Sequence, residues 1–130
     1  MGELRLKAKV RSGARRLTRE CDVFFDSGST KNLIRAEFAA ELGSVIPLAA
    51  PVRFRGIADG AFKSRQLVQL HLRLGGVWVD TLAYVAPPEA FEERILLGQE
   101  FMQEFGVVLD MRRDRVLLDV RRLKRGHYIH

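Results

Sequence analysis

The stretch Val23-Phe24-Phe25-Asp26-Ser27-Gly28-Ser29-Thr30 decides which fold this sequence predicts. Its first residues are apolar and β-prone, and they lead directly into an acid, a hydroxyl residue and a glycine. A strand that ends in this way carries the Asp26 carboxyl out of a buried sheet and into a tight turn. Gly28 suits a turn that needs a positive φ or a close backbone approach. Ser27 adds a hydroxyl that forms hydrogen bonds locally or across an interface.

Taken alone, the stretch also fits an ordinary strand followed by a turn, because Asp, Ser and Gly are common turn residues. The sequence downstream favours a more specific interpretation. In order, it contains a short apolar piece (Asn32–Ile34), a helix-like segment (Ala36–Leu42) stopped by Gly43, a glycine-bearing hairpin (Gly56–Phe62), and Ile95-Leu96-Leu97-Gly98 leading into Gln99–Met102.

This ordered set resembles the retropepsin-like aspartic proteases, and the resemblance runs from about Leu4 to Asp119. It implies an all-β, closed β-barrel-like acid protease fold with one or two short helices, acting as a symmetric homodimer. Residues 1–130 are then a single domain. The implied activity is that of an aspartic endopeptidase on a protein or peptide substrate, with no cofactor and no metal.

The resemblance also assigns roles to particular residues. It makes Asp26 the catalytic acid and gives the support of its loop to Ser27, Gly28 and Ser29. It places the flap over substrate at Ile57, Ala58, Asp59 and Gly60, and a structural motif beneath the site at Leu96, Leu97 and Gly98. A hydrogen bond from Ser29 to the outer oxygen of Asp26 would favour the charged carboxylate and an acidic optimum.

The number of Asp-Ser-Gly motifs determines how such a site is built. The sequence contains one, at Asp26, whereas Asp59 precedes a glycine without the intervening hydroxyl. Aspartic proteolysis needs two carboxylates that share a proton. If the chain is an aspartic protease, the second one must therefore be Asp26 of another copy, which requires a C2 homodimer with the site on its axis.

The composition fits one globular domain of 130 residues. Cys21 is the single cysteine, so it forms no internal disulfide, and we expect it to be a small core residue. No apolar run has the length of a membrane span, and the N-terminus lacks a signal core. We expect a soluble chain, either cytoplasmic or the soluble domain of a longer, possibly membrane-anchored protein.

The net charge of +6 arises from basic residues gathered near both ends of the sequence. Such a distribution is compatible with nucleic-acid binding. However, aromatic residues are not interleaved with these cations, and no nucleic-acid motif is present. We therefore expect a solvated basic face and no nucleic-acid partner, with attraction to acidic partners as the alternative.

Alternating and periodic patterns predict the remaining elements. Strands are expected at 4–11, up to Asp26, and at 31–34, 52–57, 61–67, 68–74, 77–86, 107–111 and 116–118, with short helices at 36–42 and 99–105. Pro47 and Pro51 are expected to bound a loop, and His71 to be exposed and without a partner. The segment Val120–His130 is expected to be a frayed tail or a strand recruited into a dimer.

Two other functions stay open at this point. One is a catalytically inactive module of the same fold that binds peptides or forms dimers. The other is an unrelated small β-barrel that binds acidic partners, which would make the ordered motifs a coincidence. An intact Asp26-Ser27-Gly28 favours the enzyme over both.

Overall fold

The computed structural model describes residues 3–12, 17–57 and 60–129, and these form strands and short helices. The strands are β1 (Glu3–Ser12), β2 (Arg19–Asp26), β3 (Leu33–Arg35), β4 (Val45–Ile57), β5 (Gly60–Leu74), β6 (Val77–Ala86), β7 (Ile95–Leu97), β8 (Val108–Asp110) and β9 (Arg115–Leu117). The helices are α1 (Ala36–Leu42), α2 (Gln99–Phe105) and α3 (Val120–Ile129), with a 3-10 turn at Pro88–Ala90.

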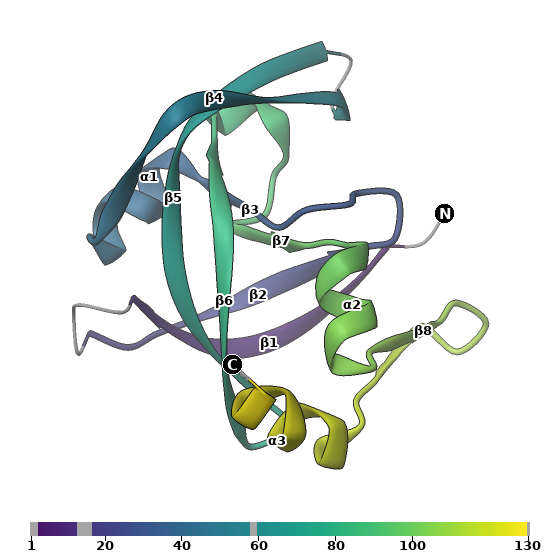
Figure 1. Ribbon diagram of the computed structural model, residues 1–130. Helices are drawn as coiled ribbons and strands as arrows, with labels where there is room; N and C mark the ends of the chain where they lie inside the picture. Colours follow the sequence, from purple (N-terminus) through teal and green to yellow (C-terminus); the bar gives the residue numbers. More distant parts are fainter. Residues whose placement is uncertain (1–2, 13–16, 58–59, 130) are drawn as a thin grey trace.

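Seven of the strands form one sheet in the order β1-β2-β7-β3-β6-β5-β4. A further pairing of β1 with β5 joins Lys9–Ser12 to Leu70–Arg73, so the sheet closes on itself as a barrel of six strands with β4 outside the closure. Figure 1 shows the barrel, with β8 and β9 standing apart from it as a separate hairpin. The expected all-β fold with a closed barrel is therefore confirmed.

The core follows from strand alternation. Inward residues of β1, β2 and β5 are buried while their neighbours face outward, as period two requires. Two helices close the barrel with aromatic side chains: Phe38 of α1 and Phe101 of α2 are 1% and 2% exposed. Phe25 of β2 is fully buried, with its ring 6.5 Å from that of Phe101. Phe25, the last buried residue of β2, therefore fixes the strand directly before Asp26.

Cys21 lies in this core, and burial raises the pKa of its thiol to about 11. Because only the thiolate reacts with alkylating reagents, we expect Cys21 of the native protein to be alkylated about 100-fold more slowly near pH 8 than in the unfolded chain. Mass spectrometry after timed iodoacetamide treatment, with and without denaturant, measures this ratio. Equal rates in the two states would contradict the buried position.

The prolines of β4 depart from the sequence expectation. Pro47 and Pro51 do not bound a loop but lie within β4, where the pairing with β5 shifts register between Pro47 and Val52. β4 is the last strand of the sheet, so one of its edges is unpaired, and an edge strand tolerates residues without an N–H. The strands expected at 61–67 and 68–74 are also one continuous strand, β5.

The structure of the C-terminal segment differs from the one expected from the sequence. Val120–Ile129 is a helix, not a frayed tail or a strand. Asp119 begins it, since its carboxylate accepts a hydrogen bond from the Arg122 N–H at 3.1 Å, which is an N-cap contact. Leu123 is fully buried, and Arg122 donates from Nε to the Glu104 carbonyl, which ties α3 to α2.

Among the described residues, no helix has the length and apolarity to cross a membrane.

His71 was expected to be exposed and unpartnered, and this is wrong. The antiparallel register of β5 and β6 places His71 opposite Asp80, and His71 Nδ1 contacts the Asp80 carboxylate. The two residues are nine positions apart in sequence, so only the pairing register reveals the contact. Together they form a polar pair on the outer face of the barrel.

Candidate active site

Asp26 is the last residue of β2, between β1 on one side and β7 on the other. Its carboxylate Oδ1 accepts a hydrogen bond from the Gly28 N–H at 2.8 Å. Its backbone carbonyl accepts one from the Ser29 N–H at 3.1 Å, which closes a tight turn. The carboxyl is thus held in place by the backbone of its own loop while Asp26 stays only half-buried.

Gly28 is favoured here by a close approach and not by a left-handed backbone. A Cβ at Gly28 would lie 3.1 Å from Asp26 Oδ1, and Gly28 is absent from the glycines with positive φ. Of the two reasons given by the sequence, the close backbone approach therefore applies. Ser27, between Asp26 and Gly28, is exposed, so its hydroxyl is available to an approaching molecule.

Ser29 makes a different contact from the one expected. Its hydroxyl donates to the Lys31 carbonyl at 2.9 Å, and Ser29 is 7% exposed. Within the described residues of a single chain, the donor to the Asp26 carboxylate is the Gly28 N–H. Ser29 therefore shapes the chain just after the Asp26 turn, and the expected link from its hydroxyl to an acidic optimum loses its structural basis.

Gly98 packs directly against the backbone of the Asp26 loop. A Cβ at Gly98 would lie 2.5 Å from the Lys31 carbonyl oxygen and 2.6 Å from that of Ser29. Such distances are below any tolerable contact, and both neighbours are backbone atoms. Leu96 and Leu97 precede it in the buried strand β7, whose parallel pairing with β2 joins Phe25 to Leu97. No side chain fits at position 98.

The first turn of α2 provides a second attachment for the same loop. The Gln99 N–H donates to the Ser29 carbonyl at 2.7 Å, and the Glu100 N–H donates to the Thr30 carbonyl at 3.1 Å. The first N–H groups of a helix have no partner within it, so these carbonyls satisfy two of them. The loop and the helix therefore fix each other.

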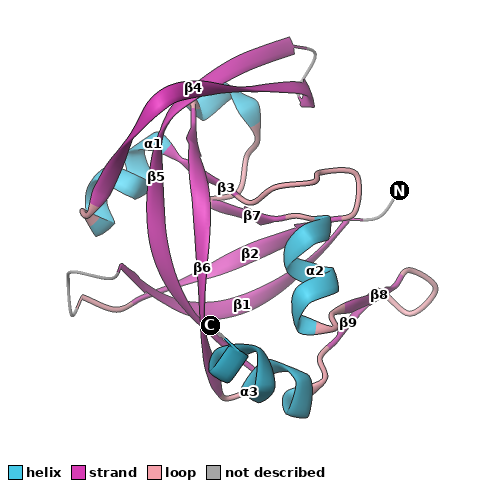
Figure 2. Cartoon of the chain, in the orientation of Figure 1, coloured by secondary structure: helices cyan, strands magenta, loops and turns pink. Residues whose placement is uncertain are grey.

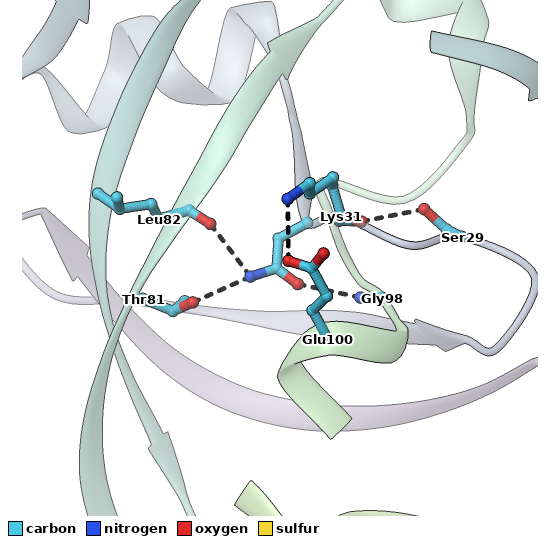
Figure 3. A network of polar contacts seen from close by, with 7 residues as sticks. Ser29, Lys31, Thr81, Leu82, Gly98 and Glu100 are labelled. Carbon is cyan, nitrogen blue, oxygen red and sulfur yellow. Dashed lines mark hydrogen bonds and ion pairs between the residues drawn. The ribbon is translucent and has the colours of Figure 1, made fainter. Parts of the chain in front are cut away.

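Asn32 completes this arrangement, and the sequence analysis gave it no role. Its side chain is buried and spans two elements (Figure 3): Nδ2 donates to Thr81 Oγ1 at 2.9 Å and to the Leu82 carbonyl at 3.1 Å, while Oδ1 accepts from the Gly98 N–H at 3.0 Å. One side chain thus connects β6 to the segment beneath Asp26. The signal in the sequence is an amide at the start of the apolar run Asn32-Leu33-Ile34, where a buried polar group needs partners.

A second apolar cluster lies on the face of β2 that carries Asp26. Phe24 and Asp26 are two residues apart in the strand, so their side chains point to the same face, opposite to Phe25. This cluster has four buried residues, Leu33, Ala86, Ala90 and Leu96, and packed against it are the partly buried Phe24, Phe54, Phe62, Tyr84 and Phe91. It places an apolar, largely aromatic surface next to the carboxyl.

The hairpin expected to be a flap is formed by β4 and β5, whose last pair is Ile57 with Gly60. Ala58 and Asp59 at its tip lie outside the described residues. Below the tip, Phe54 and Phe62 are cross-strand partners with stacked rings 5.0 Å apart, and Phe54 meets Tyr84 of β6 edge-on at 5.2 Å. The hairpin is therefore joined by aromatic contacts to the cluster around Phe24.

A closed barrel with a single Asp-Ser-Gly loop at a strand end, underpinned by a glycine segment and a short helix, defines the class of acid proteases. In agreement, the family model described as aspartyl protease matches residues 7–101. This chain belongs to the aspartyl protease family.

Solved structures agree at the level of the fold. The chain is similar to the retroviral protease-like domain of Ddi1 from Leishmania major, with a TM-score of 0.60, 12% identity and 89% of each chain covered. It is also similar to the EIAV protease complexed with the inhibitor HBY-793, with a TM-score of 0.54, 17% identity, and 82% of this chain and 92% of that chain covered. No curated protein sequence matched it.

Proposed function

We propose that this protein is an aspartic endopeptidase in which two Asp26 carboxylates, one from each copy of a homodimer, activate a water molecule against a peptide bond. The observation that carries the proposal is the Asp26 turn, in which a half-buried carboxyl at a strand end is held by the Gly28 N–H at 2.8 Å. The family match supports the class of reaction.

The chemistry follows from the electrostatics of a close pair. Two carboxylates at about 3 Å would repel each other by about 5 kcal/mol at an effective dielectric of about 20. They avoid this cost by holding one proton between them. The ionised member accepts a proton from water, and the protonated member donates a hydrogen bond to the scissile carbonyl. In each copy the Gly28 N–H holds Asp26 Oδ1 in position, so little reorganisation is needed during the reaction.

The surface that the second copy covers is proposed to include the β8–β9 hairpin. This two-stranded sheet pairs with no other strand of the described chain, and it packs against the core through Leu109 and Val116, which leaves its other face to solvent. Four of the exposed large apolar residues belong to it or flank it: Val108 at 57%, Met111 and Val120 at 41%, and Leu117 at 40%. In Figure 2 the hairpin projects on the side of the barrel where β2 ends.

The substrate is proposed to be a polypeptide with large apolar residues at the cleavage point. The support is the cluster around Phe24, since this side chain shares its face of β2 with Asp26. A substrate side chain that covers partly buried aromatic rings removes apolar area from water, at about 25 cal/mol per Å². An acidic side chain would bury less apolar area on the same surface.

A cleavage assay on peptides with paired leucine or phenylalanine residues tests the proposal. We expect activity to be highest at acidic pH and to fall as the shared proton leaves the pair. A peptide analogue whose hydroxyl imitates the tetrahedral intermediate should abolish the cleavage activity. An inactive peptide-binding module, the remaining alternative, would bind the analogue without cleaving any peptide at any pH.

A further inference from the structure

A groove on the outer face of the barrel is lined by none of the residues of the Asp26-Ser27-Gly28 turn. It lies between β6 and α2 and has a volume of about 500 Å³, within the usual range of ligand sites. Leu67, Leu82 and Tyr84 provide its apolar lining, and Asp80, Glu100 and Glu104 provide carboxylates.

The apolar lining comes from cross-strand neighbours of β5 and β6. Leu67 pairs with Tyr84, and Gln69 pairs with Leu82, so these side chains stand next to one another on the outward face. Leu82 is 50% exposed, which is unusual for a large apolar side chain in the middle of a strand. An occupant with apolar side chains would cover it.

The groove is lined by more acidic than basic residues, although the whole chain has a net charge of +6. Asp80 comes from β6, whereas Glu100 and Glu104 lie one turn apart on α2 and share a face of that helix. Lys31 is the single basic residue of the lining, and its Nζ lies 3.0 Å from Glu100, while Asp80 contacts His71 of the neighbouring strand β5. A carboxylate has two oxygens and about four acceptor positions, so Glu100 can accept further hydrogen bonds. The groove therefore attracts a cationic occupant.

We propose that this groove docks an extended peptide segment in which arginine or lysine residues alternate with apolar residues. An extended chain in the groove presents successive side chains to opposite sides, so its apolar residues cover Leu82 and Tyr84 on β6 while its cationic heads reach Glu100 and Glu104 on α2. The long stems of arginine and lysine add contacts with the apolar lining. The docking does not depend on the proposed cleavage.

A peptide fits the groove better than a bare metal ion does. Among the described residues there is no group of three or more His, Cys, Asp or Glu side chains that could hold a metal. A bare cation would also leave Leu82 exposed. The occupant must therefore combine positive charge with apolar surface.

The test uses fluorescence anisotropy with a short labelled peptide of alternating leucine and arginine, and a second peptide in which glutamate replaces every arginine. The protein carries Asp26→Asn, so that no peptide is cleaved. Leu82→Lys places a cation in the groove, and Glu100→Gln removes one charge. Leu17→Lys is the matched control, because Leu17 is also an exposed leucine (37%) but precedes β2, away from the groove. Circular dichroism establishes that each variant is folded.

We expect the arginine peptide to bind, and the glutamate peptide to bind at least about tenfold more weakly. Leu82→Lys should weaken binding of the arginine peptide about tenfold, and Glu100→Gln up to about fivefold, in line with an exposed ion pair. Leu17→Lys should have no effect. The proposal is overturned if both peptides bind equally, if the groove variants bind as well as the control, or if Leu82→Lys dissociates a dimer in sedimentation while Leu17→Lys does not, because a second copy of the chain would then cover the groove.

Discussion

Asp26→Asn is expected to lower the rate of peptide cleavage by about 10³-fold or more, because an amide can neither share the proton of the pair nor act as its base. The fold should survive. The oxygen of an asparagine can accept the same hydrogen bond that the Gly28 N–H gives to Asp26 Oδ1 at 2.8 Å. Initial rates at the acidic optimum, measured together with the melting temperature, test both statements.

Asp22→Asn is the matched control for this substitution. Asp22 lies on the same strand and the same face as Asp26, but it is exposed and not part of the turn. It should keep the cleavage rate within about twofold, as surface substitutions away from special contacts usually do. A purified Asp26→Asn protein with substantial activity, or an Asp22→Asn protein as inactive as the first, would contradict the assignment of the acid.

The barrel and the loop were predictable from the sequence because local signals and tertiary structure agree there. The helices Ala36–Leu42 and Gln99–Phe105 have the expected bounds, since each presents an apolar face and ends at a glycine that terminates the helix. The strand that leads to Asp26 could also be predicted, because its apolar run has to be buried.

The features that sequence reasoning missed depend on which strands are neighbours. The contact of His71 with Asp80 and the hydrogen bonds of Asn32 with Thr81 and Gly98 join residues brought together by strand pairing. No local pattern encodes a register. The prolines of β4 were misread because a proline argues against a central strand but not against an edge strand, and the sequence does not reveal which strand is at the edge.

The helix at the C-terminus was missed for a different reason. Its composition is strongly basic, and its isolated helical propensity is weak for so short a segment. Tertiary contacts stabilise this helix, because Leu123 is buried and Arg122 donates a hydrogen bond to the Glu104 carbonyl near the end of α2. Asp119 is the local signal that could have indicated its start, since aspartate is a preferred N-cap residue.

The most discriminating prediction follows from the single Asp-Ser-Gly motif in the chain. If each site needs two Asp26 carboxylates, an equal mixture of wild-type and Asp26→Asn chains should keep about a quarter of the activity of the same total of wild-type protein, provided that pairing is random. A site contained in one chain would keep about half. The mixture is made at high protein concentration, and mass-labelled chains report that exchange is complete.

The same mechanism requires specific activity to fall on dilution below the dimer dissociation constant. The favourable contribution is burial of apolar residues such as Val108 and Leu117, and the opposing one is repulsion between two chains of charge +6. Because salt screens charges over about 8–10 Å near physiological ionic strength, moderate salt should raise activity at low protein concentration. An equal mixture of wild-type and Asp22→Asn chains should keep the full activity of the same total of wild-type protein. Half-activity in the Asp26→Asn mixture after proven exchange, or a fully active monomer in sedimentation, would rule out the shared site.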